Sequence, residues 1–132
     1  MLGDHIELTF PGGKRVDARL GDFVIRSDQA VSLGGEASAP APFDLFLASI
    51  ATCAGIFALG FCQARKLETQ GLGLRMEWTW DEKKKLIAGI RINLTLPDGF
   101  PDHYRDGILR AVDLCAVKRH LHEAPDFSVN LT

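Results

Sequence analysis

The amino-acid sequence predicts a single α+β domain, on three observations. Residues 43–62 form a run of twenty almost entirely apolar side chains with one charge among them. Short segments that alternate apolar and polar residues stand on both sides of this run, and that period is typical of half-buried strands. The chain of 132 residues has the length of one domain, 1–132, and can bury a core of its own.

Residues 1–37 are expected to form a β-meander followed by a loop. Three short runs alternate apolar and polar residues, the first with Ile6, Leu8 and Phe10 on one face. The segment PGGKR and a Gly-Asp pair separate these runs, and both contain residues that favour tight turns. A loop rich in Gly and Pro then leads to the apolar run.

Residues 42–66 are predicted to form a long central helix. Pro42 suits the first turn, where its missing N–H costs nothing. Asp44 follows in the same turn and complements the helix dipole, as Arg65 and Lys66 do at the other end. The run is long enough to span a membrane. We interpret it as a core helix instead, because the amphipathic segments after it need a cover. A second subunit would cover the apolar helix surface that these segments leave exposed, so an obligate dimer is favoured.

Three further elements are expected after the central helix. Residues 72–96 alternate apolar and polar side chains on both sides of a charged turn, which predicts a β-hairpin with one wet face. Residues 102–122 carry an apolar stripe at helical spacing, and residues 126–131 alternate as a final strand.

Composition narrows the function classes. The formal net charge of −2 and the pI near 6.0 give no footprint for nucleic acid or anionic lipid. The N-terminus lacks an apolar leader segment, so a reducing cytoplasm is the expected compartment for the three cysteines. The sequence has no Cys/His spacing for a metal and no phosphate-binding glycine motif, so neither a metal nor a cofactor is expected.

The cysteines are the residues with the most chemical interest. Cys53 and Cys62 are nine positions apart, about 900° of helical rotation, so they point to opposite sides of one helix. Either could be an ordinary core residue. Cys115 lies within one turn of Lys118 and Arg119, and positive charge at that distance favours the thiolate.

Two segments together resemble the OsmC/Ohr family. They are SAPAPFDLFLASIATCAG at residues 38–55 and LCAVKRHL at residues 114–121, with a hairpin between them. The order of elements over nearly the whole chain is similar as well, and the match is closest to the short OsmC-like branch typified by YhfA. The resemblance implies an intertwined homodimer with long central helices wrapped by antiparallel or mixed sheets.

The resemblance also implies an activity. Well-characterised members reduce organic hydroperoxides with thiols, and their two cysteines align with Cys53 and Cys115. Cys53 would become a sulfenic acid and Cys115 would resolve it as a disulfide. A dithiol of the lipoyl type would act as the reductant, and the substrate would be a small apolar hydroperoxide.

The sequence departs from the peroxidase members at two places and matches a third only loosely. Their glutamate falls at Phe43 here, and the acid is Asp44, one residue and ~100° of rotation later. Their thiolate-holding arginine is best matched by Arg15, with Lys14 and Arg19 as rivals. Their C-P-[VI] motif is C-A-V, which changes the setting of the second cysteine. The candidate catalytic residues are therefore Cys53, Cys115, Asp44 and Arg15.

Three functional hypotheses remain open. The first is a thiol peroxidase with an apolar pocket at the dimer interface. The second is a small-molecule-binding protein that uses the same pocket without redox turnover, which the shifted acid and the absent proline favour. The third is a thiol- or sulfur-handling redox protein. The side chains expected to line such a pocket are Phe43, Phe46, Phe57, Met76 and Trp78.

Overall fold

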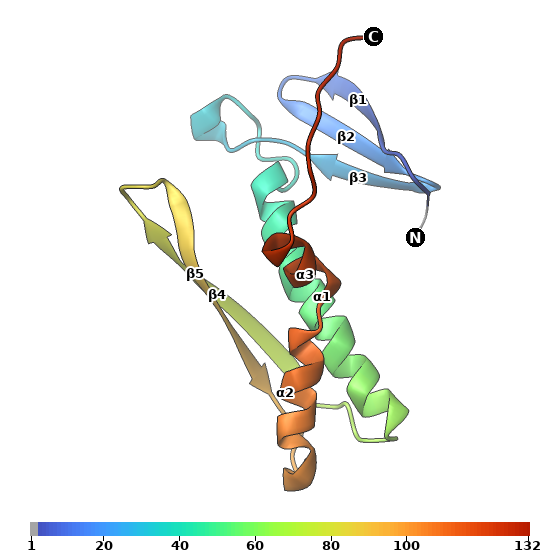
Figure 1. Cartoon of the computed structure of the whole chain (residues 1–132). Helices are drawn as coiled ribbons and strands as arrows, with labels where there is room; N and C mark the ends of the chain where they lie inside the picture. Colours follow the sequence, from blue (N-terminus) through green and yellow to red (C-terminus); the bar gives the residue numbers. More distant parts are fainter. Residues whose placement is uncertain (1–2) are drawn as a thin grey trace. The chain divides into compact units, whose positions relative to one another are not determined.

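The computed structural model describes residues 3–132 and has two compact units, one ending at Ala48 and the other Ser49–Thr132. Figure 1 shows the elements in their order along the chain, in which the long helix α1 (Pro42–Ala64) follows β1 to β3 and precedes β4 and β5. The α+β class with a long helix and antiparallel sheets is therefore confirmed.

The first unit contains a three-stranded antiparallel sheet. Its strands β1 (Glu7–Gly12), β2 (Arg15–Leu20) and β3 (Phe23–Ser27) are paired in chain order. They lie where the alternating pattern predicts strands. Gly13 and Gly21 occupy the two turns with φ near +58° and +59°, a left-handed conformation that glycine adopts at no steric cost.

A buried carboxylate organises the loop between the sheet and α1. Asp28 is 1% exposed and accepts hydrogen bonds from the backbone N–H groups of Gln29 (2.7 Å) and Ser38 (3.1 Å). The Ser38 hydroxyl donates a third bond, 2.5 Å long. These bonds, that of Ser38 first, lower the pKa of Asp28 to about 2, although burial opposes the shift. The short helix η1 (Val31–Leu33) lies within the segment closed in this way.

At both ends of helix α1 a side chain forms a hydrogen bond with a backbone group. Pro42 is its first residue, and the backbone N–H of Ala41 donates to Asp44 Oδ2 at 3.0 Å, which is half of a capping box. At the other end Arg65 Nη1 donates to the Phe61 carbonyl at 3.2 Å. The Arg65 guanidinium also lies 3.6 Å from the Phe61 ring centroid. The helix ends at Ala64, two residues before the predicted end, with Lys66 at φ 54°.

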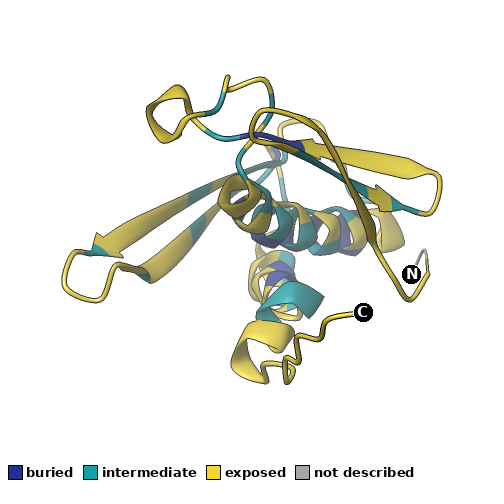
Figure 2. Ribbon diagram, turned by 90° about the horizontal axis from the view of Figure 1, so that it is seen from above, coloured by how far each residue is buried: buried dark blue, intermediate teal, exposed yellow. Residues whose placement is uncertain are grey.

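The second unit contains a two-stranded hairpin. Strands β4 (Gly73–Asp81) and β5 (Leu86–Thr95) pair antiparallel, with Met76 opposite Ile92 and Trp78 opposite Ile90. The apolar face of the hairpin is partly buried near its base and exposed toward its tip, where Trp78 is 50% exposed. Figure 2 shows this change of burial along the strands.

The predicted helix 102–122 is wrong as one continuous element. The chain forms a short turn η2 (Asp102–Tyr104) and then two helices, α2 (Arg105–Asp113) and α3 (Ala116–His122). Cys115 stands in the break with φ −48° and ψ 125°, an extended conformation that no helix interior contains. The apolar stripe continues across the break, so its spacing concealed the interruption.

The predicted final strand 126–131 is also wrong for the described chain. Residues 124–132 form no strand, and Phe127 and Leu131 are 88% and 101% exposed. Figure 2 shows the whole segment as exposed. The reason is physical: a strand is stabilised by backbone bonds to a neighbouring strand. Within the described residues this segment pairs with none.

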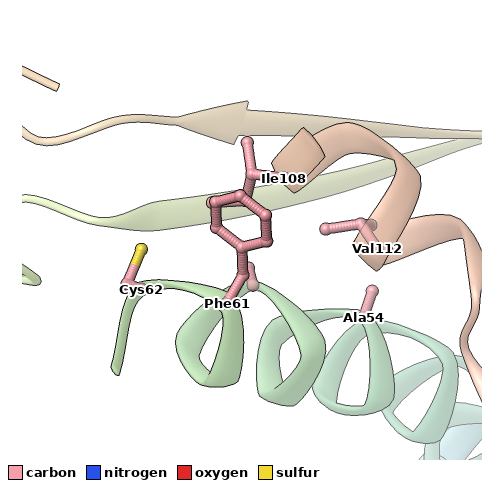
Figure 3. Packing of buried hydrophobic residues seen from close by; sticks show 6 residues of the cluster. Ala54, Phe61, Cys62, Ile108 and Val112 are labelled. Atoms are coloured by element: carbon pink, nitrogen blue, oxygen red, sulfur yellow. The ribbon is translucent and has the colours of Figure 1, made fainter. Parts of the chain in front are cut away.

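The core of the second unit lies between α1 and α2. Ala54, Phe61 and Cys62 of α1 pack with Ile108 and Val112 of α2, and Figure 3 shows Ile108 next to the Phe61 ring and Val112 above Ala54. The two helices approach closely, because a Cβ added to Gly107 would lie 3.0 Å from the Phe61 ring. Partly buried residues of the hairpin close this core, among them Leu74, Ile92 and Leu94.

Helix α1 is long and apolar enough to cross a membrane by length and composition alone. A core helix of a soluble protein passes the same test, and this helix carries the main buried cluster of the second unit. Its packing against α2 supports the prediction that it is a core helix.

Candidate thiol site

The structure brings Cys53 and Cys115 together within one chain. Cys53 is in the middle of α1, and the break between α2 and α3 carries Cys115 to it. The Cys115 thiol hydrogen-bonds to the Cys53 sulfur, and all three thiols of the chain are free. Cys115 is fully buried, whereas Cys53 is partly exposed. Two thiols in contact, one of them open to solvent, can form a disulfide after the open one is oxidised.

The surroundings of Cys53 favour its thiolate. Burial acts against the charged form, but several groups together outweigh it and lower the pKa of Cys53. They are hydrogen bonding from the Cys115 thiol, hydrogen bonding from the backbone N–H groups of Val117 and Ala116, and the positive charge of Arg119. A low thiol pKa combined with partial exposure is the setting of reactive cysteines.

The surroundings of Cys115 favour its neutral thiol, which corrects the expectation that nearby Lys118 and Arg119 would make it a thiolate. Burial raises the pKa of Cys115, and so does its hydrogen bond to Cys53. The backbone N–H groups of Lys118 and Val117 oppose this rise without reversing it. The charge of Arg119 acts on Cys53 instead. The site therefore pairs one acidic thiol with one ordinary or weaker acid.

Cys62 lies outside this pair. It is fully buried in the cluster between α1 and α2, as Figure 3 shows. Burial raises the pKa of Cys62, although Arg65 acts in the opposite direction. A buried thiol with a raised pKa is chemically quiet, which agrees with its interpretation as a core residue.

The break before α3 supplies contacts that sequence reasoning missed. Ala116 begins α3 directly after Cys115, and its N–H and that of Val117 reach Cys53. The only signal in the sequence was the position of Ala116, where the family has a proline that would start a helix. Alanine at this position is also followed by a helix here, so the proline is not needed for the turn.

Asp44 and Arg15 belong to the unit that ends at Ala48, whereas both cysteines belong to Ser49–Thr132. Asp44 caps α1 through the Ala41 N–H. Arg15 Nε donates to the Gly12 carbonyl at 3.4 Å within the first β-turn region. The groups that set the pKa of Cys53 all come from the second unit.

An apolar groove of about 980 Å³ lies in the second unit. Ile50 and Val112 line it, and each stands one helical turn from one of the two cysteines in the sequence. The ion pair of Lys118 with Asp113 borders it as well. The remaining lining residues are Ile87, Ala88, Gly89, Ile90, Ile92, Leu94, Leu109, Leu121 and His122.

The residues expected to line a pocket at a dimer interface lie outside this groove of the single chain, and that expectation stays a prediction. Phe43, Phe46, Phe57, Met76 and Trp78 are not among the residues that line this groove. Trp78 borders a smaller hollow of about 430 Å³ on the hairpin, and Phe43 contacts Phe46 within α1. Most of the groove is lined by isoleucine, leucine and valine side chains of α1, β5, α2 and α3. Among residues 3–132 no three His, Cys, Asp or Glu side chains are grouped to hold a metal ion.

Comparison with known proteins gives a family. A family model described as OsmC-like protein matches residues 35–130. A comparison with curated protein sequences yields no match.

Solved structures with the same fold come from several bacteria. A Psychrobacter arcticus protein described as an osmotic stress induced and detoxification response protein has 17% identity and a TM-score of 0.73, over 90% of this chain and 89% of that chain. A hypothetical protein of Aquifex aeolicus has 18% identity and a TM-score of 0.66, over 96% and 92%. An organic hydroperoxide resistance protein of Legionella pneumophila has 16% identity and a TM-score of 0.55, over 89% of each chain. At these identities the likeness shows the fold.

Proposed function

The chain belongs to the OsmC-like protein family, and from this premise we propose that it is a thiol peroxidase that reduces organic hydroperoxides. One observation carries the proposal: a partly exposed cysteine with a lowered pKa is hydrogen-bonded to a second, buried cysteine of the same chain. The family includes organic hydroperoxide resistance proteins.

In this proposal Cys53 is the nucleophile. Its thiolate attacks the terminal oxygen of the hydroperoxide, so that an S–O bond forms as the O–O bond breaks. The alkoxide takes up a proton and leaves as the alcohol, and Cys53 becomes a sulfenic acid. The hydrogen-bond donors around Cys53 hold the thiolate in the reactive state before the substrate arrives.

Cys115 is the resolving residue. Its thiol attacks the Cys53 sulfur, the S–S bond forms, and hydroxide leaves with the thiol proton as water. A dithiol of the lipoyl type then returns both cysteines to thiols through two exchange steps and becomes oxidised itself. The raised pKa of Cys115 suits this order, because a neutral thiol can donate a hydrogen bond to the thiolate that reacts first.

We assign the substrate to the apolar groove of the second unit, whose lining includes residues three positions before each cysteine. Ile50 precedes Cys53 by one turn of α1, and Val112 precedes Cys115 by three residues. An apolar lining favours a small hydrocarbon hydroperoxide over hydrogen peroxide, because burial of hydrocarbon surface contributes to binding. We also propose that the chain belongs to the short YhfA-like branch of the family, which the shifted acid Asp44 and the C-A-V segment support. We keep Arg15 as the candidate arginine for the thiolate and Asp44 as its candidate partner acid.

We further propose that the working form is a cytoplasmic homodimer, the usual assembly of this family. Thr52, Ile56 and Gly60 form one exposed line along α1, and Ile56 is 65% exposed. An exposed isoleucine on a mostly apolar helix supports this face as a surface for a second chain. A reducing compartment would keep the three thiols free until a peroxide reaches them.

The proposal is tested by peroxide consumption. Cumene hydroperoxide is supplied with dihydrolipoamide, and wild type is compared with Cys53→Ser, Cys115→Ser and the matched control Cys62→Ala. We expect turnover in wild type and in the control, and none in Cys53→Ser. Peroxide without reductant should remove two of the three free thiols. Three persisting thiols and no consumption would exclude the peroxidase.

A second function, small-molecule binding without turnover, is favoured by one observation. Asp44 caps α1 through Ala41 and so is engaged in a structural role. In that case the groove would bind an apolar ligand and both cysteines would be inert. Binding of an apolar fluorescent probe that survives Cys53→Ser, together with absent turnover in wild type, would select this function over the first. Disulfide exchange without peroxide consumption would select a thiol-handling role.

A further inference from the structure

An ion pair crosses the break that carries Cys115. Lys118 Nζ lies 2.5 Å from Asp113 Oδ1, so the last residue of α2 is joined to the first turn of α3. Leu114 and Cys115 are the residues between these helices. The pair therefore links the two ends of the short segment that carries the buried Cys115 thiol.

The position of both charges is unfavourable to the helices themselves. Asp113 stands at the C-terminal end of α2, where the helix dipole disfavours an anion. Lys118 stands in the first turn of α3, where the dipole disfavours a cation. Helix stability therefore accounts for neither charge. The ion pair between the two residues accounts for both. The Lys118 side chain is only 27% exposed, so it lies against the protein when it reaches Asp113.

We propose that Asp113 and Lys118 are a positioning pair for the two thiols: they hold the bend between α2 and α3 so that the Cys115 side chain and the backbone after it stay against Cys53. The inference deepens the proposed function, because it concerns the same thiols. Both residues also line the groove assigned to the substrate, so the test below measures Cys53 itself and uses no substrate.

The bend determines what Cys53 meets. Apart from burial, the groups that shift its pKa are Cys115, Arg119 and the backbone N–H groups of Ala116 and Val117. All four residues belong to the break or to α3. If the bend loosens, all of these contacts weaken together, and the Cys53 thiol becomes a weaker acid.

The sign of one substitution separates positioning from plain electrostatics. Asp113→Asn removes a negative charge, and charge alone would then make Cys53 a stronger acid. Loss of positioning would make it a weaker acid. We expect the second result, with the rate of iodoacetamide modification of Cys53 at pH 7 falling about two- to five-fold, the range that an exposed ion pair supplies. Lys118→Met should slow the reaction similarly, and the double variant should be no slower than the slower single variant.

The readout is the pH profile of Cys53 modification, resolved from Cys62 and Cys115 by fragment-ion mass spectrometry on the full-length protein. Asp102→Asn is the matched control, because Asp102 pairs with Arg105 at the other end of α2 and spans no break. Thermal unfolding verifies that each variant is folded. A faster or unchanged modification of Cys53 in folded Asp113→Asn would overturn the proposal. The profile needs no peroxide turnover, so it fails or succeeds separately from the peroxidase assay.

Discussion

The hydroxyl of Ser38 donates a 2.5 Å hydrogen bond to Oδ2 of Asp28, ten residues earlier in the chain. Both backbone and side chain of Ser38 serve the same carboxylate. The contact closes the loop that precedes α1 and leaves the carboxylate 1% exposed. It also makes the stability of this loop depend on pH.

Asp28→Asn should reduce stability in a pH-dependent manner. The pKa of Asp28 is about 2 in the folded protein against 3.8 ordinarily, so folding favours the ionised form. The resulting stabilisation is fully present above about pH 4 and is lost as pH falls toward 2. Thermal melts of wild type and variant should therefore differ at pH 6 and converge near pH 2. A gap that stays constant over this range would contradict the ionised hydrogen-bond network.

Gly35→Ala should disrupt the same loop by a steric route. A Cβ at this position would lie 2.1 Å from the carbonyl oxygen of Gln29, a backbone atom that cannot move without the loop. We expect faster cleavage in this loop under limited proteolysis and a lower melting temperature. Gly89→Ala is the control, since its Cβ would meet Thr79 Oγ1 at 3.4 Å and needs only a small adjustment. Equal behaviour of the two variants would argue against the tight loop.

Cys53 should be the most reactive thiol of the reduced chain. Its pKa is lowered, whereas burial raises the pKa of Cys62 and of Cys115. At neutral pH iodoacetamide should modify Cys53 first, because the thiolate is the nucleophile. Site-resolved mass spectrometry after short exposures measures the order. Prior modification of Cys115 would reverse the assignment of the two roles.

Arg65→Ala should lower the free energy of unfolding by about 1–2 kcal/mol, from the loss of a cation–π contact and of a bond to a helix-terminal carbonyl. The guanidinium lies over Phe61 at 3.6 Å and near Tyr104 at 5.6 Å. Urea denaturation measures the change. Arg65→Lys keeps the charge but loses the planar stacking, so an intermediate value is expected. A loss in Arg65→Lys as large as in Arg65→Ala would assign the whole effect to stacking geometry.

Ile56→Asp should dissociate the proposed homodimer. Ile56 is 65% exposed in the single chain, and a charge in an apolar interface is costly when it has no partner. Sedimentation velocity should show a dimer for wild type and a monomer for the variant. Lys84→Asp, at the charged hairpin turn, serves as the surface control and should leave the dimer intact. A dimeric Ile56→Asp would place the interface elsewhere.

Regular elements with strong local signals were predictable from the sequence. Alternation located the meander and the hairpin, and Pro42 with Asp44 located the start of α1. The resemblance paired Cys53 with Cys115, and the structure brings these two side chains together. These signals are local patterns or sequence motifs. Both can be recognised without knowing which residues lie nearby in the folded chain.

What escaped prediction depends on tertiary surroundings. The break at Cys115 was hidden because Ile108, Val112 and Cys115 keep their buried stripe across it. The pKa of Cys115 was expected to fall because Lys118 and Arg119 are adjacent in the sequence. Burial raises it instead, and burial cannot be known from the sequence. The segment 126–131 has the pattern of a strand, but pairing requires a partner edge that a sequence pattern cannot supply.

The two cysteines differ in how freely their backbones can yield. Cys53 is held inside α1 by helical hydrogen bonds on both sides, whereas Cys115 stands outside either helix at the bend before α3. A disulfide draws two sulfurs to about 2.05 Å, closer than any hydrogen-bonded pair. The small backbone movement that brings the sulfurs together can occur at the bend that carries Cys115. Cys53 can therefore stay in place within α1 while Cys115 moves toward it. The chain can cycle between thiol and disulfide while the α1–α2 core stays packed.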